Sequence, residues 1–122
     1  MTEVELQHLL AYWQPRLRLA DWAVTVQLVT TREIGDHTIN GTCDPLLQQK
    51  VARIQILRPE DHPDNSFLPY DAERSLVHEL LHCWAVPFEP ENQQSLAYTS
   101  LEQMLNALAR ALVELKRQGG QP

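Results

Sequence analysis

The chain has 122 residues, 43% of them hydrophobic and 21% charged, which is typical of one soluble globular domain rather than of a disordered or fibrous protein. Its formal net charge of −6 disfavours nucleic acid and anionic membrane surfaces as partners. Two cysteines are too few for a disulfide framework, and the sequence shows neither a signal peptide nor an apolar run of the about 20 residues that span a bilayer. We therefore expect a cytoplasmic protein.

The first half of the chain predicts one helix and three strands. Thr2 and Glu5 have the spacing of a capping box, and apolar residues follow at helical spacing until Pro15. Apolar and polar residues then alternate with the period of a strand, least clearly around Gly41. The expected elements are a helix over residues 3–14 and strands over residues 22–28, 37–43 and 51–57.

The second half predicts a long surface loop followed by two helices. Three prolines and several small polar residues favour the loop, Asp71 can cap the first helix, and Pro87 and Pro90 end it. The expected elements are a loop over residues 58–70, a helix from 71 to 84 or 85, and a last helix that begins between 92 and 100 and ends near 119. We therefore expect a single α+β domain over residues 1–118 and a flexible tail over residues 119–122.

The helix expected after Asp71 carries an H-E-x-x-H motif at residues 78–82. Because a helix turns by about 100° per residue, His78 and His82 project from one face a turn apart, which suits two ligands of one tetrahedral zinc ion. Glu79 lies too far around the helix to be an ideal ligand, so it is free to accept a proton from metal-bound water. We expect the helix to bury its opposite, apolar side and to offer the metal from this one. The alternative is an ordinary amphipathic helix with two exposed histidines.

A third ligand is expected to be a carboxylate, because no histidine follows His82. Glu89 and Glu91 stand in a proline-flanked turn, which offers a ligand poor rigidity, and Glu114 faces away from the leucine stripe of its helix. Glu102 lies on the rim of that stripe, where packing can turn it toward the histidines, so we favour it. A lone helical glutamate is otherwise more often a solvated surface residue.

With these residues the chain resembles the gluzincin zinc metallopeptidases, in which two helical histidines and a glutamate from a following helix hold the metal. The 19 residues from 83 to 101 give the ligand spacing of thermolysin-like members, and the order of elements is similar to that of the smallest zincin domains of bacteria and their phages. The resemblance implies a zincin-like fold with His78, His82 and Glu102 as ligands of one Zn²⁺, and Glu79 as general base and proton shuttle.

The resemblance also implies supporting residues. Many gluzincins have an aspartate four residues after the ligand glutamate that bonds a ligand histidine, whereas Asn106 stands at that position here. An amide oxygen can accept the same hydrogen bond but raises the basicity of the imidazole less. Tyr98 is the first candidate for stabilising the oxyanion of the intermediate, followed by Tyr70 and His62, and packing or surface roles are the alternative for all three.

The remaining conspicuous residues predict structural roles. Trp13, Trp22 and Trp84 sit on apolar faces and are expected to build the core. We expect Cys83 to be a core-edge thiol rather than a ligand, whereas Cys43 lies on the weakest strand and could approach the cleft.

The motif and the resemblance together predict a zinc-dependent metallopeptidase that acts on a peptide or protein substrate. Such a substrate would pair its backbone with an exposed strand edge above the zinc. Two other classes stay open: a zinc-binding or metal-free regulatory or interaction module on a zincin framework, and a metal-dependent hydrolase that acts on a non-peptide bond.

Overall fold

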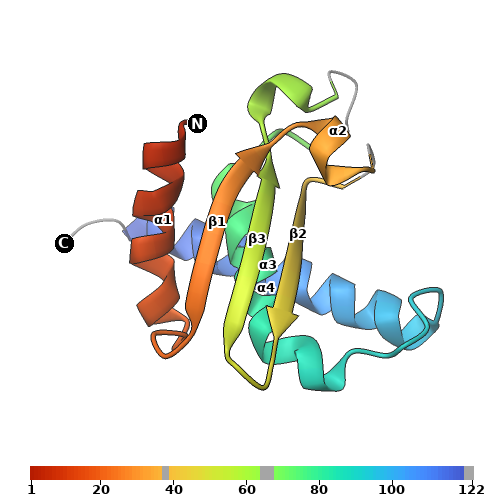
Figure 1. Ribbon diagram of the computed structural model, residues 1–122. Helices are drawn as coiled ribbons and strands as arrows, with labels where there is room; N and C mark the ends of the chain where they lie inside the picture. The colour runs from red at the N-terminus through yellow and green to blue at the C-terminus, as the bar shows by residue number, and fades with distance from the viewer. Residues whose placement is uncertain (37–38, 64–67, 120–122) are drawn as a thin grey trace.

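The computed structural model describes residues 1–36, 39–63 and 68–119. Within these residues, four α-helices and a three-stranded mixed sheet form an α+β fold (Figure 1). The elements are α1 (Glu3–Arg16), β1 (Ala23–Val29), α2 (Thr31–Ile34), β2 (Gly41–Leu46), β3 (Val51–Leu57), α3 (Ala72–Ala85) and α4 (Leu96–Gly119). None of these helices is both long enough and apolar enough to cross a bilayer.

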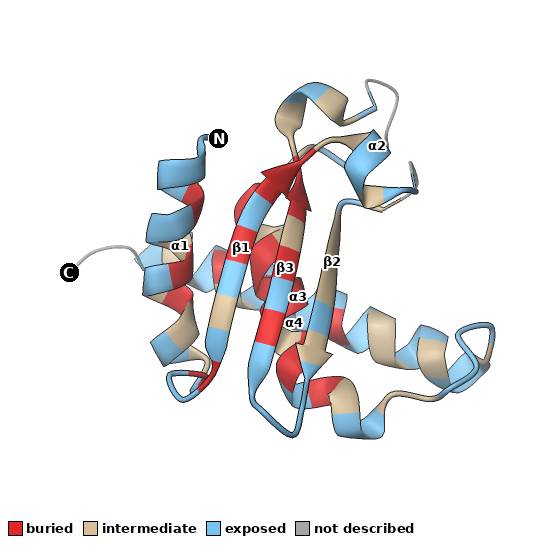
Figure 2. Cartoon of the chain, viewed as in Figure 1, coloured by how far each residue is buried: buried red, intermediate tan, exposed pale blue. Residues whose placement is uncertain are grey.

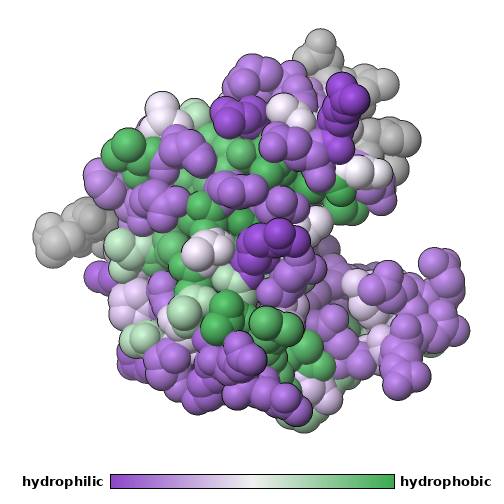
Figure 3. Space-filling view, in the orientation of Figure 1, coloured by the Kyte–Doolittle hydropathy of each residue, from purple (hydrophilic) through white to green (hydrophobic). Residues whose placement is uncertain are grey.

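The strands lie in the order β1-β3-β2. β3 pairs with β1 in parallel, placing Val26 opposite Ile54, and with β2 in antiparallel, placing Cys43 opposite Ile54. β2 is therefore an edge strand, which explains how it accommodates Pro45, a residue that cannot donate to a strand ladder. Alternate residues of β1 and β3 are buried on one face, and the residues between them are exposed or partly exposed. This second face is turned toward the viewer in Figure 3, where hydrophilic and hydrophobic residues both appear.

Helices α1 and α3 cover the apolar face of the sheet, and α4 packs on α3 (Figures 1 and 2). Full burial of a leucine or isoleucine side chain contributes roughly 1.5–3 kcal/mol relative to exposure, so the shared core holds α3 firmly against β2 and β3. The largest side chains of this core are Leu6, Leu10, Trp13, Leu19, Trp22, Leu28, Ile54, Ile56, Leu76 and Leu80.

The helix that carries the motif has the predicted bounds. The carboxylate of Asp71 accepts a hydrogen bond from the backbone N–H of Arg74 at 3.0 Å, which caps α3 as expected. The strand predicted over residues 51–57 is β3. These are the two elements with the clearest start signals and hydrophobic periods.

Other boundaries differ from the prediction. α1 runs to Arg16, because Pro15 lies in its last turn, where proline removes few helical hydrogen bonds. The strand expected over residues 37–43 is found as β2, which starts at Gly41 and continues through Pro45, while residues 37–38 lie outside the described part. The short helix α2, with a capping box between Thr30 and Glu33, was not predicted.

The last helix and the long loop agree with the prediction in part. α4 begins at Leu96, within the expected interval, and includes Gly119, so the tail expected over residues 119–122 is helical in its first residue. Residues 120–122 lie outside the described part. The expected loop contains a 3₁₀ turn at Pro59–Asp61, and its residues 64–67 are likewise outside the description.

The prediction that Trp84 belongs to the core is wrong. Trp13 and Trp22 are buried, but Trp84 is 53% exposed. It stands in the last turn of α3, where its indole N–H donates to the backbone carbonyl of Leu17 at 2.8 Å, just after the end of α1. Helical spacing places Trp84 on the apolar side of α3, but the neighbouring layer ends before it can cover the ring.

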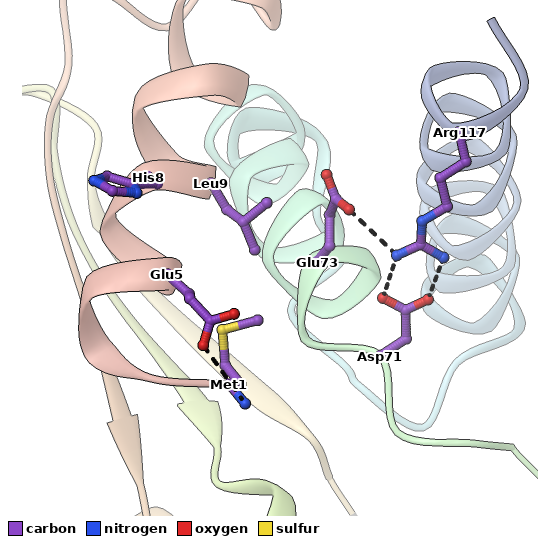
Figure 4. Close-up of a pocket in the computed structure, with 7 residues that line it drawn as sticks. All are labelled: Met1, Glu5, His8, Leu9, Asp71, Glu73 and Arg117. Carbon is purple, nitrogen blue, oxygen red and sulfur yellow. Dashed lines mark hydrogen bonds and ion pairs between the residues drawn. The ribbon is translucent and has the colours of Figure 1, made fainter. Parts of the chain in front are cut away.

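Charged residues attach the second half of α4 to the start of α3. Arg117 donates to both carboxylate oxygens of Asp71, at 2.9 and 3.0 Å, and to Glu73 at 3.2 Å. The Glu73 carboxylate also accepts from Lys116 and, at 2.7 Å, from the indole N–H of Trp13. Asp71, Glu73 and Arg117 of this cluster border a pocket between α1, α3 and α4 (Figure 4), whose volume is about 340 Å³. The residues that line the pocket do not include the motif histidines.

Candidate metal centre

The motif lies in the second half of α3, where the helix is covered on two sides. His82 and Glu79 are only 9% and 7% exposed, and His78 is largely buried as well. The expectation that α3 would present the histidines on an open side is therefore wrong, because α4 packs over that side. The two imidazoles lie against Glu102 of α4.

The side chains of His78, His82 and Glu102 converge between α3 and α4. His78 Nε2 lies 3.3 Å from His82 Nε2, and the two carboxylate oxygens of Glu102 lie 3.1 Å from His78 Nε2 and 3.0 Å from His82 Nε2. Ligands held about 2.0–2.1 Å from a tetrahedral metal are about 3.3 Å apart, so these separations are close to those of one face of a metal tetrahedron. The structure thus brings Glu102 to the histidine pair.

The motif residues also form a group that can hold a metal ion. The ligand atoms of His78, Glu79 and His82 all lie within 4.8 Å of one another. Glu102 Oε1 is a buried atom without a hydrogen-bond partner among the described residues, although it lies 3.0 Å from His82 Nε2.

Glu89 determines which nitrogen of His82 carries the proton. Its Oε2 lies 2.9 Å from His82 Nδ1, and a carboxylate can only accept a hydrogen bond there, so Nδ1 carries a proton; in the neutral imidazole the lone pair is then on Nε2. A 3₁₀ turn over Val86–Phe88 follows α3 directly and folds Glu89 back toward the helix. The sequence predicts that this proline-flanked turn is too loose to supply a ligand. In the structure, Glu89 contacts the Nδ1 side of His82, away from Nε2.

His78 is biased toward its neutral form. Burial lowers its pKa and so does His82, while Glu102 and the side chain of Asn106 raise it, and the net pKa lies below the usual value. Asn106 therefore lies beside His78, one turn after Glu102. Its contact is not a well-formed hydrogen bond, because His78 Nδ1 is buried without a partner of good geometry in the described part of the chain.

Glu79 is a carboxyl group in an apolar and acidic environment. Burial, followed by the charges of Glu102, Glu89 and Cys83, raises its pKa to about 8. The start of β2 lies against it, since a Cβ added at Gly41 would be 3.2 Å from Glu79 Oε2. The glycine that made this strand uncertain in the sequence is thus the residue that lets the strand approach the glutamate.

Tyr98, in the first turn of α4, lies beside the same group of side chains. Burial raises its pKa, as do the charges of Glu102, Glu89 and Glu79 and a hydrogen bond to Glu102. Its backbone N–H donates to Ser95 Oγ at 3.1 Å, which fixes the start of the helix. The phenol therefore lies beside the converging side chains, at the position expected for it.

The other two oxyanion candidates are engaged elsewhere. The hydroxyl of Tyr70 donates to the carbonyl of Leu57 at 2.7 Å, and His62 Nε2 lies 2.9 Å from the carbonyl of Leu68. The two rings contact each other edge to face, with centroids 5.7 Å apart. Both residues therefore hold the segment between β3 and α3 rather than contacting the converging side chains.

The remaining candidate residues, two glutamates and two cysteines, differ in how far they are exposed. Glu91 and Glu114 are exposed. Cys83 is buried at the core, as expected, and its hydrogen bond with Cys43 lowers its pKa. The same contact, together with burial and the charge of Glu79, raises the pKa of Cys43, so Cys43 does reach the neighbourhood of the candidate site.

The site therefore consists of two histidines and a buried glutamate from α3, a glutamate and a tyrosine from α4, and a glutamate from the turn between the two helices. Comparison of the chain with family models, curated proteins and solved structures gave no match.

Proposed function

We propose that the protein is a zinc-dependent peptidase with a zincin-like arrangement of its catalytic helices. The supporting observation is the convergence of His78 Nε2, His82 Nε2 and the Glu102 carboxylate at separations of 3.0–3.3 Å. With His82 protonated on Nδ1 and Glu102 ionised, these groups direct lone pairs at one another, and only a shared cation or extra protons relieve that repulsion. Two imidazoles and one carboxylate with an open fourth position are the donor set of catalytic zinc.

The residues present fit zinc, and each has a distinct role. His78, His82 and Glu102 would hold the ion, and Glu89 would orient His82 and increase its basicity. When bound, zinc supplies Lewis acidity that polarises a substrate carbonyl and acidifies water. Glu79 would accept a proton from the attacking water and donate it to the leaving amine, a role suited to a buried carboxyl group that lies beside the proposed ligands.

Tyr98 and β2 would act on the substrate. The Tyr98 hydroxyl lies beside Glu102 and can donate a hydrogen bond to an oxyanion that develops at the site. β2 is an edge strand that begins beside Glu79, so an extended peptide paired with its outer edge would pass the general base. This arrangement favours a peptide over a compact small molecule as substrate.

Metal analysis combined with a cleavage assay tests the proposal. The purified protein should contain about one zinc per chain, and His78→Ala and Glu102→Ala should each lose it, whereas Glu114→Ala, an exposed glutamate on the same helix, should not. Glu79→Gln should keep zinc but lose cleavage of a quenched fluorescent peptide library by at least about 100-fold.

Each outcome discriminates between the functional classes. A protein that binds zinc but cleaves no peptide in the library contradicts the peptidase and supports a binding or regulatory module. Unchanged zinc content in Glu102→Ala contradicts the ligand set. Full activity in Glu79→Gln contradicts the general base.

A further inference from the structure

α4 has a second apolar stripe that the rest of the described chain does not cover. Its contact with α3 buries Leu105, Ala109 and Val113. A separate row of apolar residues follows at alternating spacings of four and three along the helix. This row, the outer stripe, consists of Ala97, Leu101, Met104, Leu108, Ala111 and Leu115.

Five of the six residues of the outer stripe are exposed, and Leu101 is partly buried. Met104, Leu108 and Leu115 are 52%, 43% and 64% exposed, and Ala97 and Ala111 are exposed as well. At about 100° per residue, the centre of the stripe lies about 110° around the helix from the side that faces α3. Alternating spacings of four and three are the a and d positions of a heptad, so the stripe has the pattern of a helix that packs against another helix.

The first half of α4 is also poorly anchored. Its first nine residues, from Leu96 to Met104, include no buried residue (Figure 2), although they carry Tyr98 and Glu102. The buried residues and the contacts of Arg117 with Asp71 all lie from Leu105 onward. A second helix on the outer stripe would support the unanchored half from its free side.

Residue sizes along the stripe match a second copy of the same stripe in antiparallel orientation. With Met104 opposite Leu108 of the other copy, the remaining layers pair Leu101 with Ala111 and Ala97 with Leu115. Every layer then places a large residue against a small one or two medium residues together, which fills space evenly. Parallel pairing in register would instead stack Ala97 on Ala97 and Ala111 on Ala111, which leaves gaps.

Charge favours the same arrangement. The residues that border the stripe on the side away from α3 are Ser100, Ala107 and Glu114, and antiparallel pairing places Glu114 near Ser100 of the other copy, so no like charges meet. Antiparallel pairing also opposes the two helix dipoles and separates the acidic sites at the two N-terminal halves, which parallel pairing would bring together in a chain of net charge −6.

We propose that the protein forms a symmetric dimer through antiparallel packing of the outer stripes of α4. The stripe is about 27 Å long, so the interface has an area on the order of 1,000 Å², at the low end for specific complexes. The dimer should therefore assemble at micromolar rather than nanomolar concentrations. Pairing requires no metal, so the dimer and the metal site can fail independently of each other.

Sedimentation equilibrium on the full chain tests the dimer. Between about 1 and 300 µM, with chelator and with zinc alike, the average mass should rise from the chain mass of 14.0 kDa toward twice that value. Leu108→Lys should raise the dimer dissociation constant at least about 30-fold, because it places a charge at the centre of the interface. Gln103→Lys introduces the same charge on the polar side of α4 and should leave the constant unchanged.

Two checks make the result decisive. Circular dichroism should show unchanged helicity in Leu108→Lys, and Leu115→Lys, at a more exposed end of the stripe, provides a second disrupting variant. Under mild oxidation, Leu101→Cys should form a disulfide with Ala111→Cys in a mixture of the two proteins, and neither should cross-link to itself.

A mass that stays at one chain across the range, or a Leu108→Lys protein that dimerises normally, overturns the proposal. Self-cross-linking of Leu101→Cys overturns its antiparallel orientation.

Discussion

His82 is held at both of its ring nitrogens. Nδ1 contacts Glu89 at 2.9 Å, while Nε2 meets His78 and Glu102. A carboxylate behind a ligating imidazole fixes the tautomer, orients the ring and increases the electron density on the opposite nitrogen. In the proposed metal site, Glu89 would therefore act on a bound metal through His82, as a positioning residue.

Replacing Glu89 by Gln should weaken zinc binding by about 10-fold to 100-fold, since the amide keeps the size of the side chain but removes its charge. Competition with a chromophoric chelator measures the affinity directly. Glu91→Gln, two residues away and exposed, is the matched control and should bind zinc as the wild type does. Equal affinities for all three proteins would remove Glu89 from the site.

Glu79 makes the metal-free protein sensitive to pH. Its pKa is raised to about 8 from an ordinary value near 4.5, mainly by burial. Between these values the folded state binds a proton that the unfolded state has lost. Its contribution to stability is therefore fully present below about pH 4.5 and is lost as the pH rises toward 8.

Glu79→Gln should therefore stabilise the metal-free protein increasingly as the pH rises. Glutamine cannot ionise, so the difference in free energy of unfolding between variant and wild type should grow from pH 5 to pH 8 and reach about 1–3 kcal/mol. Urea denaturation in the presence of chelator, at several pH values, measures this difference. A difference that is constant with pH would show that Glu79 is not held in its protonated form.

At the level of elements, β2 and α3 fit together because of one missing side chain. A Cβ at Gly41 would lie 3.1 Å from the carbonyl oxygen of Gln55 and 3.2 Å from both Glu79 Oε2 and a methyl carbon of Ile56. Two of these neighbours are held in place, one by the backbone of β3 and one by the core. The third, the Glu79 carboxylate, is thus the group that an added methyl would displace.

Gly41→Ala should lower peptide cleavage about 10-fold or more and destabilise the fold by about 1–3 kcal/mol, because overpacking shifts both the strand and the general base. Zinc content should stay at one per chain, since the ligands come from α3 and α4. Thr42→Ala, at the next position of β2, is the control and should change both quantities little. Normal cleavage by Gly41→Ala would show that Glu79 does not depend on this contact.

The elements differ in how far the sequence predicted them, for physical reasons. The bounds of α3 follow from a local cap at Asp71 and from its hydrophobic period, and the approach of Glu102 follows from the motif combined with an amphipathic helix. Glu89 was missed because its contact with His82 depends on the turn between α3 and α4, whose path no periodicity encodes. Trp84 was misplaced because helical spacing gives a direction but not where the neighbouring layer ends.

At the level of the whole molecule, the site lies where two differently supported parts meet. α3 is packed between the sheet and α4, and its histidines are fixed by that core. Glu102 comes from the first nine residues of α4, none of which is buried. A metal bound by both helices is therefore a cross-link that closes α4 onto α3, and its binding energy is available only to the folded state.

Zinc should consequently stabilise the whole fold. At a free zinc concentration about 1,000 times the dissociation constant, ligand linkage adds about 4 kcal/mol, which raises Tm by about 10 °C or more for a domain of this size. Thermal unfolding with chelator and with added zinc measures the shift. His78→Ala should abolish it, because one ligand is lost, whereas Tyr98→Phe should retain it, because the phenol lies beside the ligands without being one. Equal shifts in His78→Ala and wild type would mean that zinc binds elsewhere, and the convergence of side chains between α3 and α4 would then be only a packing contact.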